Sequence, residues 1–572
     1  MAGQYWDRYW AARRSRRRFL GGAATLSAGA AGLALVGCGD DDDDGPSPTN
    51  TQGIATNTPA PDATPTPDDP LAGVKRGGTL KLDATGDWAS LDPYGSGSFT
   101  TKGYASYVYS RLFRFNSGPG VAKADLHPVG DLAESVESSP DAQEWTVTLR
   151  EGVKFHNKAP VSGRTMTTDD ILFSWGRMTA ETNATRNNIA FVDKMDVIDG
   201  KTIKFTLKTP NAAFLDVFTD ANNFWVMPKE ADGGFDPAQT SIGSGPWMLD
   251  SYTASVGTKF SANREWHHGP DYPLMDNVEV AIITEYANRL AQFQSGATHA
   301  SGIASDDIVN VKNAFPNVNL WGEVSQQLSF FYMDSNPDSP WNKDPRVRRA
   351  ISMAIDRKGI LDFSYNIPAL KAAGLNVSER WNNLIPAGME RFWLDPQSDA
   401  QGASKAYFQY NVAEAKALLS AAGFPSINTK YIYTPVRYGS VFDTAAEAHV
   451  QMLNEVGITV QVDPQDYNSL YFPQTLAGNF EGIAFGLQTP FPEAGSYSGR
   501  MFTANPLNHS RILLPEMIDL HQRQQAELDF EKRRELIYEI QRKNAENMYY
   551  IPNNIGAGTG WLGFQGIVKN YD

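Results

Sequence analysis

Hydrophobic and polar residues follow two different periods along the chain after Gly77. Apolar residues alternate with polar ones in three segments, which are residues 77–84, 144–150 and 201–208. This alternation is typical of half-buried β-strands. Within residues 347–360 the apolar side chains recur at helical spacing, with arginines on the opposite face; they are Val347, Ala350, Ile351, Ala354 and Ile355. The chain is therefore predicted to mix strands with amphipathic helices.

The second half of the chain predicts a parallel sheet. Strand-like segments alternate there with helix-like ones, in the order 430–435 (strand), 442–456 (helix), 457–463 (strand), 467–476 (helix) and 479–486 (strand). A β-α-β-α-β order predicts a right-handed, parallel α/β lobe. Two longer helices are expected near 515–528 and 530–547, before two short strands around 549–553 and 560–564. The predicted fold class is α/β.

The loops after these strands are candidates for a ligand site. Ligands of open parallel sheets bind beyond the carboxyl ends of the strands. The loops at these ends combine aromatic with polar side chains, which suits a small-molecule cleft; their candidate residues are Arg437, Tyr438, Gln488, Thr489 and Glu493. Two solvated loops are the alternative interpretation.

The N-terminus has the layout of an export signal. A basic segment is followed by an Ala/Gly/Leu-rich run that ends at Cys38. The segment around Arg16 and Arg17 resembles a twin-arginine signal, and residues 35–38 resemble a bacterial lipobox, which implies lipid attachment at Cys38. A retained N-terminal membrane anchor is the alternative. Residues 45–72 are rich in Pro and Thr, so a disordered tether is expected behind the acidic run 40–44.

Composition narrows the possible functions. A hydrophobic content of 41% and an aromatic content of 11% allow a sizeable core and exclude a wholly disordered chain. Cys38 is the one cysteine among 572 residues, which excludes an intrachain disulfide and a cysteine-based zinc site. The 50 Lys and Arg against 65 Asp and Glu give a charge of −15, which argues against general nucleic-acid binding.

Several motifs in chain order resemble the dipeptide/oligopeptide-type (family 5) solute-binding proteins of ABC importers. The matching segments are 75–94, 127–157, 167–178, 243–249, 263–280, 342–361, 411–424 and 529–541. They extend over essentially all of 75–572. The resemblance implies a two-lobed periplasmic-binding-protein-like clamp that hinges around a solute and delivers it to a membrane permease.

The resemblance also implies an order of domains. Lobe I is expected to comprise 75–116, 190–328 and 546–572, with 117–189 as an extra subdomain, and lobe II to comprise 329–545. The signal (1–37) and the tether (38–74) precede them. The expected protein is a monomer, anchored by its lipid on the extracytoplasmic face of the membrane, with a small organic solute or short peptide and an ABC permease as partners.

Cleft residues of the family lie in the loop after the first strand and at the crossing between lobes. The corresponding candidates here are Trp88, Phe331 and Tyr332, beside the loop residues above. Trp88 capping the core is an alternative, as is a surface ion pair for Arg437, which would otherwise suit a carboxylate.

One segment departs from the family. Peptide-binding members usually carry a Gly-Trp-x-x-Asp segment whose aspartate pairs with the α-amino group of the ligand. Here Leu487 stands at the tryptophan position and Pro490 at the aspartate position. A buried ammonium without a carboxylate is costly, so an uncharged or amide-bearing ligand is expected, unless Glu493 substitutes for the aspartate rather than lying at the rim.

Enzymatic motifs are weak. His267 and His268 form the one adjacent histidine pair; neighbouring side chains diverge on a helix or strand, and the resemblance places this pair in a turn, so no metal site is expected. The sequence has no His-Glu-x-x-His motif and no Gly-x-Ser-x-Gly motif, so no catalytic residue or cofactor is expected. Residues 199–202 superficially end like a phosphate loop and are interpreted as a turn before a strand. The remaining alternatives to an importer component are a sensor that docks on a membrane receptor and, more remotely, a secreted hydrolase.

Overall fold

The structure is a computed structural model that describes residues 74–568, except 119–120, 123–124, 184, 489, 492 and 506. The expected signal, tether and lipid-attachment residue, with Arg16, Arg17 and Cys38, lie outside the described residues. None of the helices in the described ranges combines the length and apolar character needed to cross a membrane.

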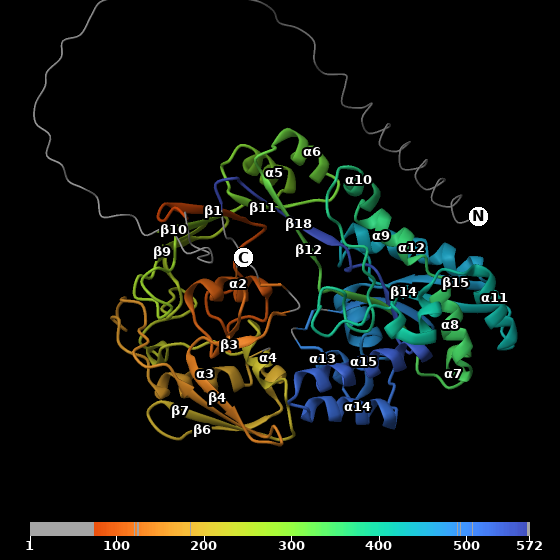
Figure 1. Cartoon of the computed structure of the whole chain (residues 1–572), viewed down its shortest axis with the longest axis horizontal. Coiled ribbons are helices and arrows are strands. Elements are labelled where there is room, and N and C mark those ends of the chain that lie inside the picture. Colours follow the sequence, from red (N-terminus) through yellow and green to blue (C-terminus); the bar gives the residue numbers. More distant parts are fainter. Residues whose placement is uncertain are drawn as a thin grey trace, which may run out of the picture. The chain divides into compact units, whose positions relative to one another are not determined.

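The chain folds into two lobes built on separate sheets (Figure 1). The five-stranded sheet of lobe II has the spatial order β15 (Ile458–Pro464), β14 (Ile427–Tyr433), β16 (Ile483–Gln488), β13 (Leu328–Met333) and β17 (Ile551–Asn553). Strand β14 runs parallel to β15 and β16, whereas β13 is antiparallel to β16 and β17. The expected parallel β-α-β-α-β unit is therefore present.

Helices of lobe II follow the apolar periodicity. They include α11 (Val412–Ala421), α12 (Ser440–Glu455), α13 (Gly495–Phe502), α14 (Pro515–Ala526) and α15 (Phe530–Asn547). The segment Tyr467–Thr475 forms a π-helix rather than the expected α-helix, and Pro473 lies inside it.

The helix expected over 347–360 is two helices. They are α8 (Pro345–Met353) and α9 (Arg357–Ser364). The break occurs because Asp356 caps α9 by accepting the Gly359 N–H at 2.8 Å. All five apolar residues predicted for the buried face are buried. The apolar periodicity therefore identified the buried face of this segment, but not the break between α8 and α9.

Lobe I contains two sheets. One has the order β1 (Thr79–Ala84), β10 (Asn277–Ile282), β9 (Gly257–Ala262) and β8 (Trp247–Thr253), and the other β11 (Ala300–Ile303), β18 (Thr559–Phe564) and β12 (Asn319–Val324). The C-terminal segment thus contributes β17 to lobe II and β18 to lobe I.

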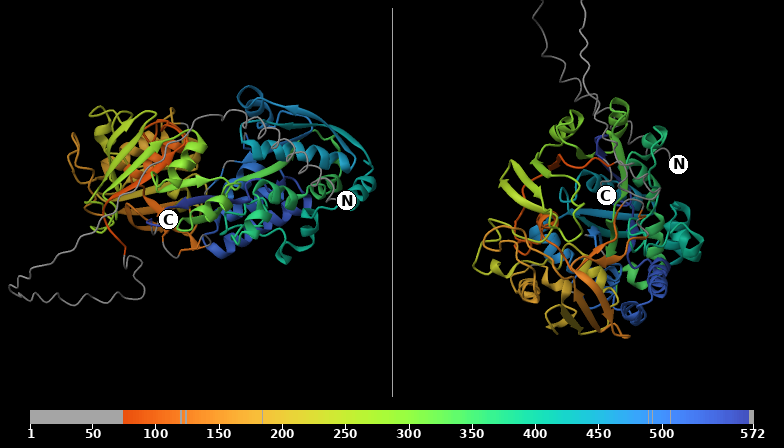
Figure 2. Two further views of the ribbon diagram at one scale, coloured as in Figure 1. Left: turned by 90° about the horizontal axis from the view of Figure 1, so that it is seen from above. Right: turned by 60° about the vertical axis from the view of Figure 1, so that its left-hand side comes forward.

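The extra subdomain is a four-stranded antiparallel sheet with the order β4 (Ala133–Ser138), β5 (Glu144–Leu149), β7 (Thr202–Leu207) and β6 (Val192–Val197). Helix α3 (Thr168–Thr179) lies between these strand pairs in sequence, and α4 (Phe214–Thr219) follows them. Figure 2 shows these orange and yellow elements gathered apart from the blue and cyan elements of lobe II. Strands β6 and β7 come after residue 189, so the sheet extends past the boundary expected there.

Candidate functional site

A cavity of about 300 Å³ is lined by residues from both lobes. Lobe II contributes residues at the carboxyl end of β16 and on α13. Lobe I contributes the start of α2 (Phe99–Val108) and the segment after α4. The polar lining residues are Thr185, Asn188, Asp220, Asn222, Asn223, Gln488, Glu493, Ser496 and Arg500. The cavity therefore lies where ligands of parallel sheets bind, beyond a strand's carboxyl end.

Two of the residues predicted from the sequence, Gln488 and Glu493, line this cavity. Gln488 is the last residue of β16, and its Oε1 accepts a hydrogen bond of 3.1 Å from Arg500 Nη1. Arg500 also lies over the ring of Phe491, with its guanidinium carbon 5.0 Å from the centroid. Burial lowers the pKa of Arg500, and no described carboxylate forms an ion pair with it. A half-buried guanidinium that contacts only neutral groups is suited to an anionic partner.

Glu493 lies at the cavity but its carboxylate is already occupied. Its side-chain oxygens accept the N–H groups of Gly495 at 2.6 Å and Ser496 at 2.8 Å, and it forms an ion pair with Arg533 of α15. Glu493 and Arg533 are each almost wholly buried. Because the two charges neutralise each other, Glu493 is not free to replace the aspartate that family members use for an amine.

Next to the Glu493–Arg533 pair, a buried ion pair joins lobe I to lobe II. Asp216 of α4 pairs through Oδ1 with Arg391 Nη1 at 2.8 Å, and its Oδ2 lies 3.7 Å from Arg533 Nη1. Burial raises the pKa of Asp216, and the positive charges of Arg391 and Arg533 oppose that rise. The neighbouring backbones also meet, since Ala212 donates to the Gln525 carbonyl at 2.6 Å. These contacts close one side of the space between the lobes.

Phe331 and Tyr332 are core residues. Both are fully buried in β13. The Phe331 ring packs edge-on against His449 and Phe485, while the Tyr332 hydroxyl donates to that of Tyr471 at 2.9 Å. Packing inside the lobe II core leaves neither side chain exposed, and neither lines the cavity, in contrast to the cleft position expected for them.

The remaining predicted residues lie outside the cavity lining. Trp88 donates a hydrogen bond from Nε1 to Thr258 Oγ1 at 2.6 Å and packs on the lobe I core. This position corresponds to the alternative given for it, in which Trp88 caps the core. Arg437 is exposed and lies over the Tyr467 ring, 4.5 Å from its centroid, rather than in a surface ion pair. Tyr438 packs edge-on against Phe442. Thr489 is outside the described residues.

Four charged residues of this region were not predicted from the sequence; they are Arg500, Arg533, Asp216 and Arg391. The burial of Arg533 was predictable from the sequence, because this residue shares one face of α15 with other buried residues, which are Ile537, Ile540, Gln541 and Asn544. A cation at helical spacing with apolar residues requires a buried partner. The other three have no such local signal.

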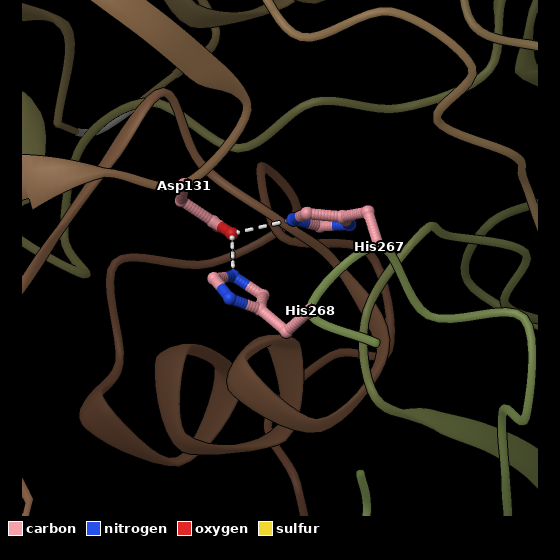
Figure 3. A group of neighbouring side chains, drawn as sticks. All are labelled: Asp131, His267 and His268. Atoms are coloured by element: carbon pink, nitrogen blue, oxygen red, sulfur yellow. Dashed lines mark hydrogen bonds and ion pairs between the residues drawn. The ribbon is translucent and has the colours of Figure 1, made fainter. Parts of the chain in front are cut away.

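His267 and His268 do not diverge. They lie in the connection after β9, and both direct Nε2 at the same oxygen of Asp131, at 2.8 and 2.9 Å (Figure 3). The segment is a turn, as the resemblance implied, and divergence would apply only to a helix or strand; the turn directs both rings to one carboxylate.

A larger hollow of about 460 Å³ lies beside β5. Its lining includes Arg150, Glu151 and Lys201, of which the last two form an ion pair at 3.0 Å. Asp199 Oδ1 accepts the N–H groups of Lys201 and Thr202, so this segment is the predicted turn and not a phosphate loop. The smaller cavity is the better ligand site, because it joins two lobes and contains residues predicted from the sheet topology.

Comparison with known proteins finds a family of solute-binding proteins, relatives in sequence and solved structures of the same fold. Residues 127–508 match the family described as bacterial extracellular solute-binding proteins, family 5 middle region. A Brucella ovis protein, whose name assigns it to ABC transporter peptide binding, is 29% identical over 377 residues, which are 63% of this chain and 65% of that protein. The match thus spans slightly less than two thirds of that relative's length.

Two further proteins extend the comparison. The glutathione-binding protein GsiB of Salmonella typhimurium is 25% identical over 389 residues, covering 66% of this chain and 68% of GsiB. The structure of HbpA2 from Haemophilus parasuis superimposes with a TM-score of 0.71 at 21% identity, covering 85% of this chain and 96% of that one. The expected two-lobed α/β fold is confirmed. Since the family match covers well over half of the sequence, this chain belongs to family 5 of the bacterial extracellular solute-binding proteins.

Proposed function

We propose that this protein is the extracytoplasmic solute-binding component of an ABC importer and has no enzymatic activity of its own. It captures one small organic solute in the cavity between its lobes and presents the closed form to a membrane permease. The observation that carries the proposal is the cavity of about 300 Å³ to which both lobes contribute polar side chains. That volume is at the small end of the range for ligand pockets.

The lining favours a solute with a carboxylate and with amide or hydroxyl groups. Arg500 supplies a half-buried cation, while Asn222, Asn223 and Gln488 supply amides. Burial raises the pKa of Asp220, which also lines the cavity. The negative charge of Glu493 is matched by Arg533. Asp220, by contrast, forms no ion pair among the described residues, and its side chain accepts hydrogen bonds from Asn222 at 2.9 and 3.0 Å. It is therefore the lining carboxylate that an ammonium group could contact, whereas Glu493 is not.

The first experiment identifies the solute. Mass spectrometry of the ligand carried through purification, followed by calorimetric titration of the compound found, is expected to give one small carboxylate-bearing solute. Arg500→Gln is expected to weaken its binding by roughly 10–100-fold, because hydrogen bonds to a charged group contribute about 1.5–3 kcal/mol. The matched control is Arg437→Gln, which changes an exposed arginine and is expected to leave the Kd unchanged. Equal losses in the two variants, or tight binding of ordinary peptides abolished by Glu493→Gln, would contradict this assignment.

The second experiment distinguishes import from sensing. Deletion of the gene is expected to abolish uptake of the identified solute. Unchanged uptake together with a lost transcriptional response to the solute would instead indicate a sensor.

The proposal includes a signal peptide with Arg16 and Arg17, a lipid on Cys38 and a monomeric protein at the outer face of the membrane. Its support is the residue pattern of the N-terminus. Metabolic labelling with a fatty acid is expected to mark the wild type and not Cys38→Ser, and the double change Arg16→Lys and Arg17→Lys is expected to block export. Light scattering of the protein lacking residues 1–38 tests the monomer.

A further inference from the structure

Three side chains with metal-binding chemistry converge away from the solute cavity. Asp131 directly follows β3 (Pro128–Gly130), and His267 and His268 lie in the turn between β9 and β10. One potential ligand atom from each residue lies within 4.8 Å of the other two. Figure 3 shows both imidazoles directed at the carboxylate. None of the three lines either hollow described above.

The distances between the atoms are short and specific. His267 Nε2 is 2.8 Å and His268 Nε2 is 2.9 Å from the same Asp131 oxygen, Oδ1. The two rings have centroids 4.6 Å apart. Two imidazole nitrogens and one carboxylate oxygen therefore face a common point, which is a combination of donors suited to zinc and its neighbouring divalent metals.

The Asp131 carboxylate is held in one orientation by its hydrogen bonds. Its two oxygens accept hydrogen bonds from His267, His268 and the Arg111 backbone N–H. The Arg111 N–H binds Oδ2 at 3.0 Å, which fixes the orientation of the carboxylate and leaves Oδ1 to the imidazoles. Such support by neighbouring groups is typical of metal ligands.

The three side chains are largely shielded from solvent, and one of their nitrogens lacks a hydrogen-bond partner among the described residues. The exposed fractions of the side chains are 5% for His267, 10% for Asp131 and 19% for His268. The Trp266 ring packs on both imidazoles. His267 Nδ1 is buried and has no hydrogen-bond partner in the described part of the chain. A metal bound through Nε2 would leave the imidazole proton on Nδ1, so this nitrogen is a donor that still needs an acceptor and not a metal ligand.

From these contacts we propose that Asp131, His267 and His268 bind a divalent transition-metal ion of the zinc class. The ion takes the place of the two bridging hydrogens, and both histidines bind as neutral ligands through Nε2. Three protein ligands leave a further position for water on the side of His268, which is the most exposed of the three. Since the ligands come from segments 136 residues apart, the ion joins the start of the extra subdomain to the β9–β10 connection of lobe I.

The test uses the full chain without a histidine tag, treated with a chelator and then dialysed. Calorimetric titration with Zn²⁺ is expected to show about one tight site per chain, and Co²⁺ is expected to give visible absorption bands typical of nitrogen and oxygen ligands in a four- or five-coordinate site. Zn²⁺ is also expected to raise the Tm.

Variants assign the site. His268→Ser is expected to lose the Co²⁺ bands and to weaken Zn²⁺ binding by at least about tenfold, whereas His268→Cys supplies a thiolate ligand and is expected to retain Zn²⁺. His127→Ser is the matched control, because the His127 side chain is exposed and its ring Nδ1 lies at hydrogen-bond distance from the Asp125 carbonyl rather than from a carboxylate. Absence of Co²⁺ bands in the wild type, or unchanged binding in a folded His268→Ser variant, would overturn the proposal. If His268→Ser does not fold, equal Zn²⁺ binding by the wild type and Asp131→Asn would do so.

Discussion

Asp216 and Arg391 form a buried ion pair, 2.8 Å between Oδ1 and Nη1, that joins helix α4 of lobe I to lobe II. The side chains are 6% and 13% exposed. A pair that spans two lobes is formed only when the lobes approach each other, so its free energy contributes to the closed state rather than to either lobe alone.

Asp216→Asn is therefore expected to favour the open form. The closed state encloses the solute, so the variant should bind the solute at least roughly tenfold more weakly. A tenfold rise in Kd corresponds to a loss of about 1.4 kcal/mol in the free energy that favours the closed state. Calorimetry measures the affinity, and small-angle scattering of the free protein is expected to report a larger radius of gyration. Asp519→Asn removes an exposed ion pair with Arg523 and is the control. An unchanged Kd and radius in Asp216→Asn would show that the pair does not control closure.

Glu493→Gln is expected to lower stability more than it alters solute selectivity. The substitution leaves the guanidinium of Arg533, which is 5% exposed, without its closest counter-charge. Removal of one partner of a buried pair costs about 3–5 kcal/mol. Urea unfolding monitored by tryptophan fluorescence measures this loss. Glu531→Gln removes the exposed partner of Arg534 on the same helix and should change the free energy of unfolding by less than about 1 kcal/mol.

The sequence predicted the elements of the fold because each depends on local periodicity. Strand β14, helix α12 and strand β15 begin and end within about three residues of the expected positions. The same topological argument located the carboxyl end of β16, and with it Gln488 and Glu493 at the cavity.

Contacts between distant segments were beyond this reasoning. Asp216 and Arg391 are 175 residues apart, and nothing near either residue indicates its partner. Phe331 and Tyr332 were expected at the cleft because they occupy the crossing strand, but side chains on both faces of β13 are covered. The convergence of His267 and His268 depends on a turn whose conformation has no periodic signal.

The stability of lobe II is expected to fall in mild acid. Burial lowers the pKa of His449 and that of His509 to about 3, well below the value of about 6.5 in an unfolded chain. The unfolded state therefore binds more protons than the folded state between about pH 6.5 and 3, so stability is full above pH 6.5 and decreases as the pH falls.

His449→Gln tests this origin of the acid sensitivity. The imidazole bonds Tyr431 through Nδ1 at 3.0 Å and Asn553 through Nε2 at 2.6 Å, and an amide can both donate and accept in its place. Between pH 7.5 and 4.5 the wild type should lose roughly 2–3 kcal/mol more than the variant in urea unfolding. Identical losses would place the acid sensitivity in other groups.

Arg357 is expected to be essential for the stability of lobe II. The side chain is fully buried, and it donates hydrogen bonds to the carbonyl oxygens of Ser352, Phe408 and Pro552. Its burial lowers its pKa to about 9, with no carboxylate contributing to the shift. The guanidinium thus serves as a bridge between α8, the segment before α11 and strand β17.

Arg357→Met removes this bridge while keeping an unbranched apolar chain. Three buried carbonyl oxygens then lack these donors, at a cost of about 1–3 kcal/mol for each unsatisfied group. A loss of several kcal/mol is therefore expected in chemical unfolding, with a lower Tm. Arg346→Met, at a half-exposed arginine paired with Asp344, should change stability by no more than about 1 kcal/mol. Similar stabilities for the two variants would contradict this prediction. They would mean that water or a rearranged donor satisfies the carbonyls of Ser352, Phe408 and Pro552 once the Arg357 guanidinium is removed.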